Sequence, residues 1–157
     1  MLFYSHDSYG TGHLRRTLRL SRHLRRCRPA VELVVATGSP IAERFLGPSD
    51  APYAVLPPVI KVGDGVYEPR DSTRTLGEVL AERTSALLQL IEAYPPDIVV
   101  VDHAPAGLGD ELLLVFDRLV ARRPRFVRRR CGCPLEAQGW PTHLSAIRAT
   151  RSSPRAG

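Results

Sequence analysis

The chain has 157 residues, enough for one α/β domain with its own hydrophobic core but too few for two full-sized ones. Hydrophobic residues make up 43% and charged residues 24% of it, as in globular proteins, and no apolar run approaches the roughly 20 residues of a membrane-spanning helix. The N-terminal segment lacks the pattern of a signal peptide, and Cys27, Cys131 and Cys133 suggest no disulfide framework. We therefore expect a cytoplasmic protein without an integral membrane segment.

The positive charge lies at one end of the chain. The formal net charge is +6, yet residues 1–121 hold 13 basic and 15 acidic side chains, whereas residues 122–157 hold 9 arginines against the single acid Glu136. Because the larger part is slightly negative, we expect no nucleic-acid binding there. A basic arm that binds nucleic acid stays an alternative for the tail, although its only aromatic residues for stacking on bases are Phe126 and Trp140.

The first segment, Met1–Ser5, is a short apolar run that predicts a strand, and the turn residues Ser8, Gly10 and Gly12 follow it. Leucines at helical spacing then predict a helix that stops before Pro29. Six arginines occupy the rest of this helix. We interpret them as a solvated helix face rather than an anion site, because charged residues normally cover exposed helix surface.

The middle of the chain continues this alternation. An apolar strand is predicted over Glu32–Thr37, a short helix over Ile41–Leu46 and a weaker strand over Tyr53–Leu56. The segment Val59–Asp71 contains glycines and lacks helical period, so we expect a long loop. The clearest helix is predicted over Thr75–Tyr94, ahead of two prolines.

The last predicted strand is Asp97–Asp102, whose β-branched residues are typical of a strand buried on both faces, so we expect it to be central. A helix over Glu111–Val120 follows it. The alternation of strands and helices predicts an α/β domain over residues 1–123, with a doubly wound parallel sheet and helices on both faces.

The remaining residues, 124–157, have neither strand nor helix period and are rich in Arg, Pro, Ser and Gly, so we expect an irregular basic tail. A shifted reading frame in GC-rich DNA would produce this composition. The sheet would then lack a fifth strand, leaving one flank of Ile98–Val101 unpaired. We expect a poorly soluble or oligomeric product as a result.

In an open parallel sheet, ligands bind beyond the carboxyl ends of the strands, where the strand order reverses between the first strand and the fourth. Two predicted loops occupy that place. The candidate binding residues there are His6, Asp7, Gly10, Thr11 and Gly12 in the first loop and His103 in the second, with His13 as the candidate catalytic residue.

His13 stands at the predicted start of the first helix, after two glycines that would allow positive φ or a close backbone approach. A helix N-terminus presents free N–H groups and favours the neutral form of a nearby histidine, which can accept a proton from a hydroxyl group. His13 is therefore a candidate general base. A plain role as a helix-start residue stays open for it.

Other sites fit less well. The glycines lack the third glycine of a dinucleotide-binding fingerprint, no ribose-binding carboxylate ends the second strand, and no Lys-Ser/Thr pair completes a P-loop. Cys131, Cys133 and His143 do not have the number and spacing of zinc ligands. We expect neither a cofactor nor a metal ion.

Four segments, FYSHDSYGTGHLRRTLRLSRHLR, VVATGSP, LPPVIKVGDGVY and DIVVVDHAPAGLGDELL, together resemble a family of predicted bacterial glycosyltransferases related to the MurG-like, family 28 transferases. The resemblance covers Met1 to about Arg123. It implies a Rossmann-like N-terminal domain of a GT-B fold that binds a sugar acceptor, while a C-terminal domain binds the nucleotide-sugar donor. The implied reaction is hexosyl transfer without a required metal.

The resemblance places Gly10, Gly12 and His13 in a glycine-rich acceptor loop, with His13 at the position of a base. It implies that His103 faces the same cleft and binds acceptor or donor phosphate, although a packing role with Asp102 stays open. The implied donor domain does not follow Arg123, so we expect a fragment that is inactive alone. A standalone sugar- or nucleotide-binding module without catalysis is the alternative.

Overall fold

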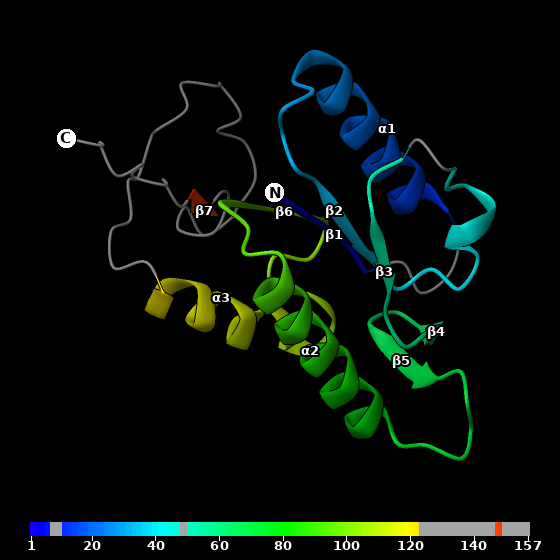
Figure 1. Cartoon of the computed structure of the whole chain (residues 1–157). Coiled ribbons are helices and arrows are strands. Elements are labelled where there is room, and N and C mark those ends of the chain that lie inside the picture. The colour runs from blue at the N-terminus through cyan, green and yellow to red at the C-terminus, as the bar shows by residue number, and fades with distance from the viewer. Residues whose placement is uncertain (7–10, 48–49, 123–146, 149–157) are drawn as a thin grey trace, which may run out of the picture.

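The computed structural model describes residues 1–6, 11–47, 50–122 and 147–148. Figure 1 shows one sheet with α1 on one side of it and α2 with α3 on the other, and a small hairpin beside α2. The elements in chain order are β1 (Leu2–Ser5), α1 (Gly12–Cys27), β2 (Val34–Thr37), the 3-10 turn η1 (Ala42–Arg44), β3 (Tyr53–Val55), β4 (Val59–Gly63), β5 (Val66–Pro69), α2 (Leu76–Ala93), β6 (Ile98–Asp102), the 3-10 turn η2 (Leu108–Asp110), α3 (Glu111–Arg122) and β7 (Ile147–Arg148).

The main sheet has the strand order β3-β2-β1-β6-β7. The first four of these strands are parallel, which confirms the predicted α/β class with a parallel sheet flanked by helices. Ser5 at the end of β1 lies opposite Thr37 of β2 and Asp102 of β6. The carboxyl ends of these three strands are therefore level, and the segments that follow them emerge at one edge of the sheet.

Alternate residues of the strands face opposite layers, as the pleat requires. Tyr4 faces the core under α2 and α3, where it packs with Leu87 and Leu112. Phe3 faces the opposite core, which Leu24 of α1 helps to cover. The helices predicted from leucine spacing thus cover both faces of the sheet.

The middle strand of the sheet is β1, and all residues of β1 and β2 are buried. The segment Asp97–Asp102 was predicted to be central and buried on both faces. Its strand, β6, is an interior strand between β1 and the short edge strand β7, but only Val99 in it is buried, so the predicted burial was wrong. A β-branched run favours a strand, but it does not fix how fully the helices beside the sheet cover it.

The predicted long loop Val59–Asp71 instead contains the antiparallel hairpin β4–β5. Its turn is Asp64-Gly65, and Gly65 has φ of +73°, a conformation that favours glycine. An Asp-Gly pair between Val-rich segments is a hairpin signal, so the sequence itself favours a hairpin here over a loop.

The expectation of a tail without structure was also wrong at one place. Residues Ile147 and Arg148 form β7, which pairs antiparallel with Ile98 and Val99 of β6. Part of the flank that we expected to be open is therefore occupied. An edge strand offers backbone N–H and C=O groups that pair with any extended segment, so such pairing leaves no periodic signal in the sequence.

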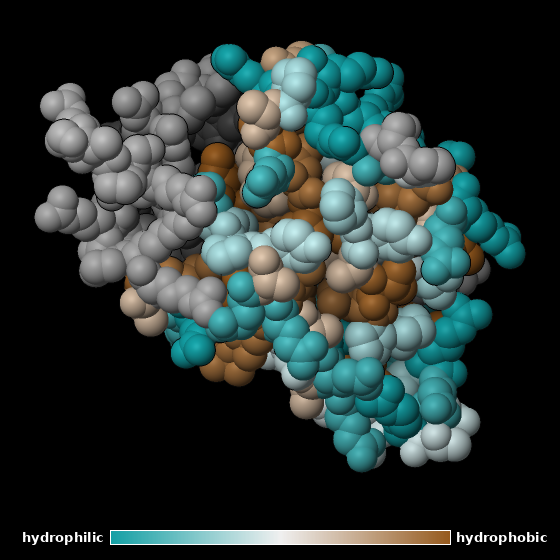
Figure 2. All heavy atoms as spheres, in the orientation of Figure 1, coloured by the Kyte–Doolittle hydropathy of each residue, from teal (hydrophilic) through white to brown (hydrophobic). Residues whose placement is uncertain are grey.

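Helix α1 is amphipathic, as predicted. Leu14 and Leu18 are buried and pack with Ala42 of η1, while the arginines face outward and form a hydrophilic area in Figure 2. Arg22 makes two hydrogen bonds of 2.6 and 2.7 Å to Asp50. No helix in the described part of the chain has both the length and the apolar character needed to cross a bilayer.

A buried ionic network joins the helices α2 and α3 to strand β1 of the sheet. The side chains of Arg83 in α2 and Glu111 in α3 are fully buried and form a bidentate ion pair with N–O distances of 2.6 and 2.8 Å. The Tyr4 hydroxyl donates to the same carboxylate and accepts from the backbone N–H of Leu108 at 3.2 Å. Burial acts to lower the pKa of Arg83, but the hydrogen bonds and charge of Glu111 outweigh it and hold that pKa above its ordinary value.

Arg83→Met leaves the Glu111 carboxylate buried without its cation, so we expect the free energy of unfolding to fall by about 3–5 kcal/mol. The double variant Arg83→Met/Glu111→Leu removes both charges and should recover much of that loss. Urea unfolding followed by circular dichroism measures both. A single variant as stable as the parent would contradict this account of the network.

Burial raises the pKa of the Tyr4 hydroxyl above its ordinary value of 10.0, and the charge of Glu111 adds to the rise. Because the raised pKa belongs to the folded state, its contribution to stability is complete below about pH 10 and is lost as the pH rises further. Tyr4→Phe should therefore flatten the alkaline decline of the unfolding free energy. Tyr94→Phe, at an exposed position, is the control and should leave the decline unchanged.

Candidate functional site

The candidate site lies at the carboxyl edge of the sheet, where β1 and β6 are neighbours. His6 follows β1 directly, and His103 follows β6 directly. Because β1 also pairs with β2 on its other side, the chain leaves β1 and β6 in opposite lateral directions, which is the arrangement of a topological switch point. His13 reaches the same place from the first turn of α1.

His6, His13 and His103, here called the histidine cluster, lie in mutual contact. The ring centroids are 5.3 Å apart for His6 and His13, 5.4 Å for His6 and His103, and 5.2 Å for His13 and His103. His6 is buried, His13 is half-buried and His103 is exposed. The cluster therefore extends from the sheet edge to the surface, where a ligand can reach it.

Asp102, the last residue of β6, orients His13. Its Oδ2 lies 3.1 Å from Nδ1 of His13, and its Oδ1 lies 3.3 Å from Nη1 of Arg16. An ionised carboxylate can only accept hydrogen bonds, so Nδ1 of His13 must be the donor. In the neutral ring, Nε2 then carries the lone pair and can accept a proton. A carboxylate that orients a histidine in this way is an arrangement that general base catalysis can use.

The loop that carries His103 is held in an unusual conformation. His103 has φ of +76°, which is uncommon for a residue other than glycine. Gly107 has φ of +79°, and a β-carbon there would lie 2.9 Å from side-chain atoms of Glu111 and Leu112, so glycine is required. The N–H of Leu108, the next residue, is fixed by Tyr4. The His103 loop is thus tied to the buried ionic network.

The structure brings His6, His13 and His103 together, as the predicted sheet edge required. Thr11 is the N-cap of α1 but makes no side-chain capping bond. Gly12 begins α1, and its φ is not left-handed, so a positive φ is not what requires glycine there. No described atom lies within 4 Å of a β-carbon built at Gly12, and its place in the binding loop stays a prediction. Asp7 and Gly10 lie outside the described residues.

Sequence reasoning gave no specific role to Asp102 as the partner of His13, or to Arg16. One feature of the sequence indicates the roles of both Asp102 and Arg16. His13 and Arg16 are three residues apart on one helix face, and that face starts at the sheet edge where β6 ends in a carboxylate.

Within the ranges that the structure describes, no group of three or more His, Cys, Asp or Glu side chains is arranged to hold a metal ion. Cys131, Cys133 and His143 lie outside those ranges.

Comparisons of the chain with protein-family models, with curated proteins and with solved structures found no match in any of the three. The function must accordingly be argued from the geometry of the site.

Asp102→Asn replaces an obligate acceptor with an amide that both donates and accepts, so it should release the tautomer of His13. In the parent protein we expect a protonated Nδ1 and an unprotonated Nε2, measured by long-range ¹H–¹⁵N spectra of the histidine rings. Asp102→Asn should give a mixture of tautomers. The exposed Asp110, whose positive φ Asn tolerates, provides the control Asp110→Asn. An unchanged tautomer in Asp102→Asn would refute the orienting role.

Proposed function

We propose that this domain is the acceptor-binding half of a GT-B-type glycosyltransferase, and that His13 is the general base of hexosyl transfer from a nucleotide sugar to an acceptor hydroxyl. The observation that carries the proposal is the 3.1 Å contact between Nδ1 of His13 and Asp102. It leaves Nε2 as the proton acceptor at the place where an open parallel sheet binds its ligands.

The proposed reaction balances as follows. The acceptor oxygen forms a bond to the anomeric carbon of the donor sugar, and the bond from that carbon to the diphosphate breaks. The acceptor proton passes to Nε2 of His13, and the nucleoside diphosphate leaves with the bonding electron pair. Asp102 stabilises the imidazolium that forms, because its carboxylate stays hydrogen-bonded to Nδ1. The proposal requires no cofactor and no metal ion.

His6 and His103 flank the proposed base and would position the acceptor. Each ring lies within 5.4 Å of its two neighbours, centroid to centroid, so one hydroxyl-bearing group could contact more than one ring. Neutral imidazole rings donate through one nitrogen and accept through the other, which suits sugar hydroxyls. The first loop residues Asp7, Gly10, Thr11 and Gly12 would complete the acceptor side.

The parallel sheet with helices on both faces supports a Rossmann-like half of a GT-B fold. The donor would be bound by a second domain, which is not part of the described residues. The domain alone is therefore expected to bind acceptor saccharides without turnover. The alternative function is a sugar- or nucleotide-binding module without catalysis. In that case the ligand binds, but no sugar is transferred even when a donor-binding domain is supplied.

The test of binding is a titration with oligosaccharides and, separately, nucleotide sugars, followed through the ring nitrogens of the histidine cluster. We expect oligosaccharides to shift Nε2 of His13. A response to nucleotides alone would favour the binding module, and no response to either ligand would contradict both readings.

The test of catalysis is His13→Ala in a hexosyl-transfer assay that supplies a donor-binding domain. Loss of a general base should lower kcat by about 10²–10⁴-fold. His23→Ala is the matched control, because His23 is exposed near the other end of α1 and should leave transfer unchanged. Equal activity of the two variants would exclude His13 as the base.

A further inference from the structure

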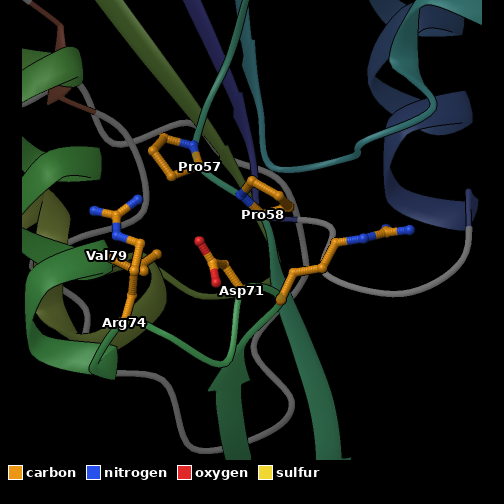
Figure 3. Close-up of a pocket in the computed structure, with 6 residues that line it drawn as sticks. Pro57, Pro58, Asp71, Arg74 and Val79 are labelled. Atoms are coloured by element: carbon orange, nitrogen blue, oxygen red, sulfur yellow. The ribbon is translucent and has the colours of Figure 1, made fainter.

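A second concave site lies near the same edge of the sheet. Its volume is about 200 Å³, and it is bounded by the turn after β3, the end of the β4–β5 hairpin and the first turn of α2 (Figure 3). The lining residues are Pro57, Pro58, Arg70, Asp71, Arg74 and Val79, here called the proline pocket. None of these residues belongs to the histidine cluster.

The walls of the proline pocket combine apolar and polar surfaces. Pro57, Pro58 and Val79 provide carbon surface. Figure 3 shows the carboxylate of Asp71 pointing toward the two prolines and the guanidinium of Arg74 extending along the side near Pro57. A ligand that fits both surfaces must present an apolar face together with hydrogen-bonding groups.

The charges around the pocket favour a neutral ligand. The two positive charges of Arg70 and Arg74 are matched in number by the charge of Asp71 in the pocket wall and that of Glu82, with which Arg74 forms an ion pair. The N-terminus of α2 is already capped by Thr75 and Glu78, so it offers little to an anion. No net positive charge therefore remains to select a phosphate or carboxylate.

Asp71 is prepared to accept hydrogen bonds from hydroxyl groups. Its Oδ1 accepts from the N–H and the hydroxyl of Thr73 at 3.0 and 2.7 Å. These hydrogen bonds lower the pKa of Asp71, so the carboxylate stays ionised and acts only as an acceptor. Both of these hydrogen bonds end on Oδ1, so Oδ2 is the oxygen to which a ligand hydroxyl would donate.

The volume limits the ligand to about one ring, because sites for larger organic ligands typically measure about 300–1,000 Å³. A hexopyranose ring matches the remaining requirements, since its C–H groups form an apolar face and its hydroxyls lie around the rim. We propose that the proline pocket binds one hexopyranose ring of the acceptor saccharide, an inference that rests on the proposed glycosyltransferase function.

The position of the pocket implies an acceptor of more than one ring. The turn Pro57-Pro58 follows β3, and the reacting hydroxyl would lie beside β1 and β6. Two strand spacings of about 4.8 Å separate β1 from β3, so one ring does not reach both places. The pocket would therefore hold a ring next to the one that reacts.

The pocket and the His103 loop are connected through the buried network. The carbonyl of Pro57 accepts a hydrogen bond of 2.8 Å from Nη1 of Arg83, and Arg83 pairs with Glu111. Tyr4 links that carboxylate to the N–H of Leu108 in the His103 loop. One buried cluster thus fixes the wall of the pocket and the loop of the base site relative to each other.

The experiment titrates the full chain with methyl glycosides of single hexoses and records backbone amide and histidine-ring signals in the same samples. We expect saturable shifts in the millimolar range at the amides of Thr73 and Arg74. Asp71→Asn keeps an oxygen for Thr73 but removes the charge, and it should weaken binding about tenfold. Asp64→Asn, at the fully exposed hairpin turn, is the matched control and should bind as the parent does.

No saturable shift at Thr73 and Arg74 in the parent, or equal affinity in Asp71→Asn and Asp64→Asn, would overturn the pocket assignment. The histidine rings separate this result from the proposed function. If oligosaccharides shift the rings while Thr73 and Arg74 stay silent, the acceptor site stands and the pocket assignment fails. If the pocket binds hexosides but His13→Ala retains full transfer, the pocket stands and the assigned base fails.

Discussion

The buried ion pair between Arg83 and Glu111 is the interaction on which the arrangement of the described domain depends. Its two side chains have no solvent exposure, so each charge lost its hydration on folding. Such a pair adds little net stability compared with apolar side chains of similar size, but it tolerates few alternative geometries. With Tyr4 and the carbonyl of Pro57 as further partners, it fixes α2 and α3 against β1 and the turn after β3.

The same network reaches the proposed site through the backbone. The Tyr4 hydroxyl accepts a hydrogen bond from the N–H of Leu108, and Gly107 beside it is packed so closely against Glu111 and Leu112 that no β-carbon fits. His103 is consequently held at a positive φ, a conformation that costs about 1–3 kcal/mol and persists only where the surroundings over-determine it. The contacts of Tyr4, Gly107 and Leu108, which lie outside the histidine cluster, thereby help to place the ring of His103 against His13.

The sequence predicts the helices and the position of two histidines of the cluster, but not the contacts that hold them in place. Apolar periodicity located the helices, and parallel alternation placed His6 and His103 at one sheet edge, because strand ends in register are level. The Arg83–Glu111 pair could not be predicted, since charged residues are expected on the surface and nothing in the sequence links positions 28 apart on different helices. The role of Asp102 was not predicted, because it depends on where the first turn of α1 lies relative to the last residue of β6.

The arginines of α1 bear on whether the site handles anions or hydroxyl groups. Arg16 contacts Asp102, Arg22 is held by Asp50, and Arg15 lies over the ring of Phe45 at 5.2 Å. Arg15 and Arg16, which lie nearest the sheet edge, thus each have a partner within the described domain. The accessible rings of the histidine cluster are those of the half-buried His13 and the exposed His103, and imidazoles suit the activation of a hydroxyl group better than the binding of a phosphate.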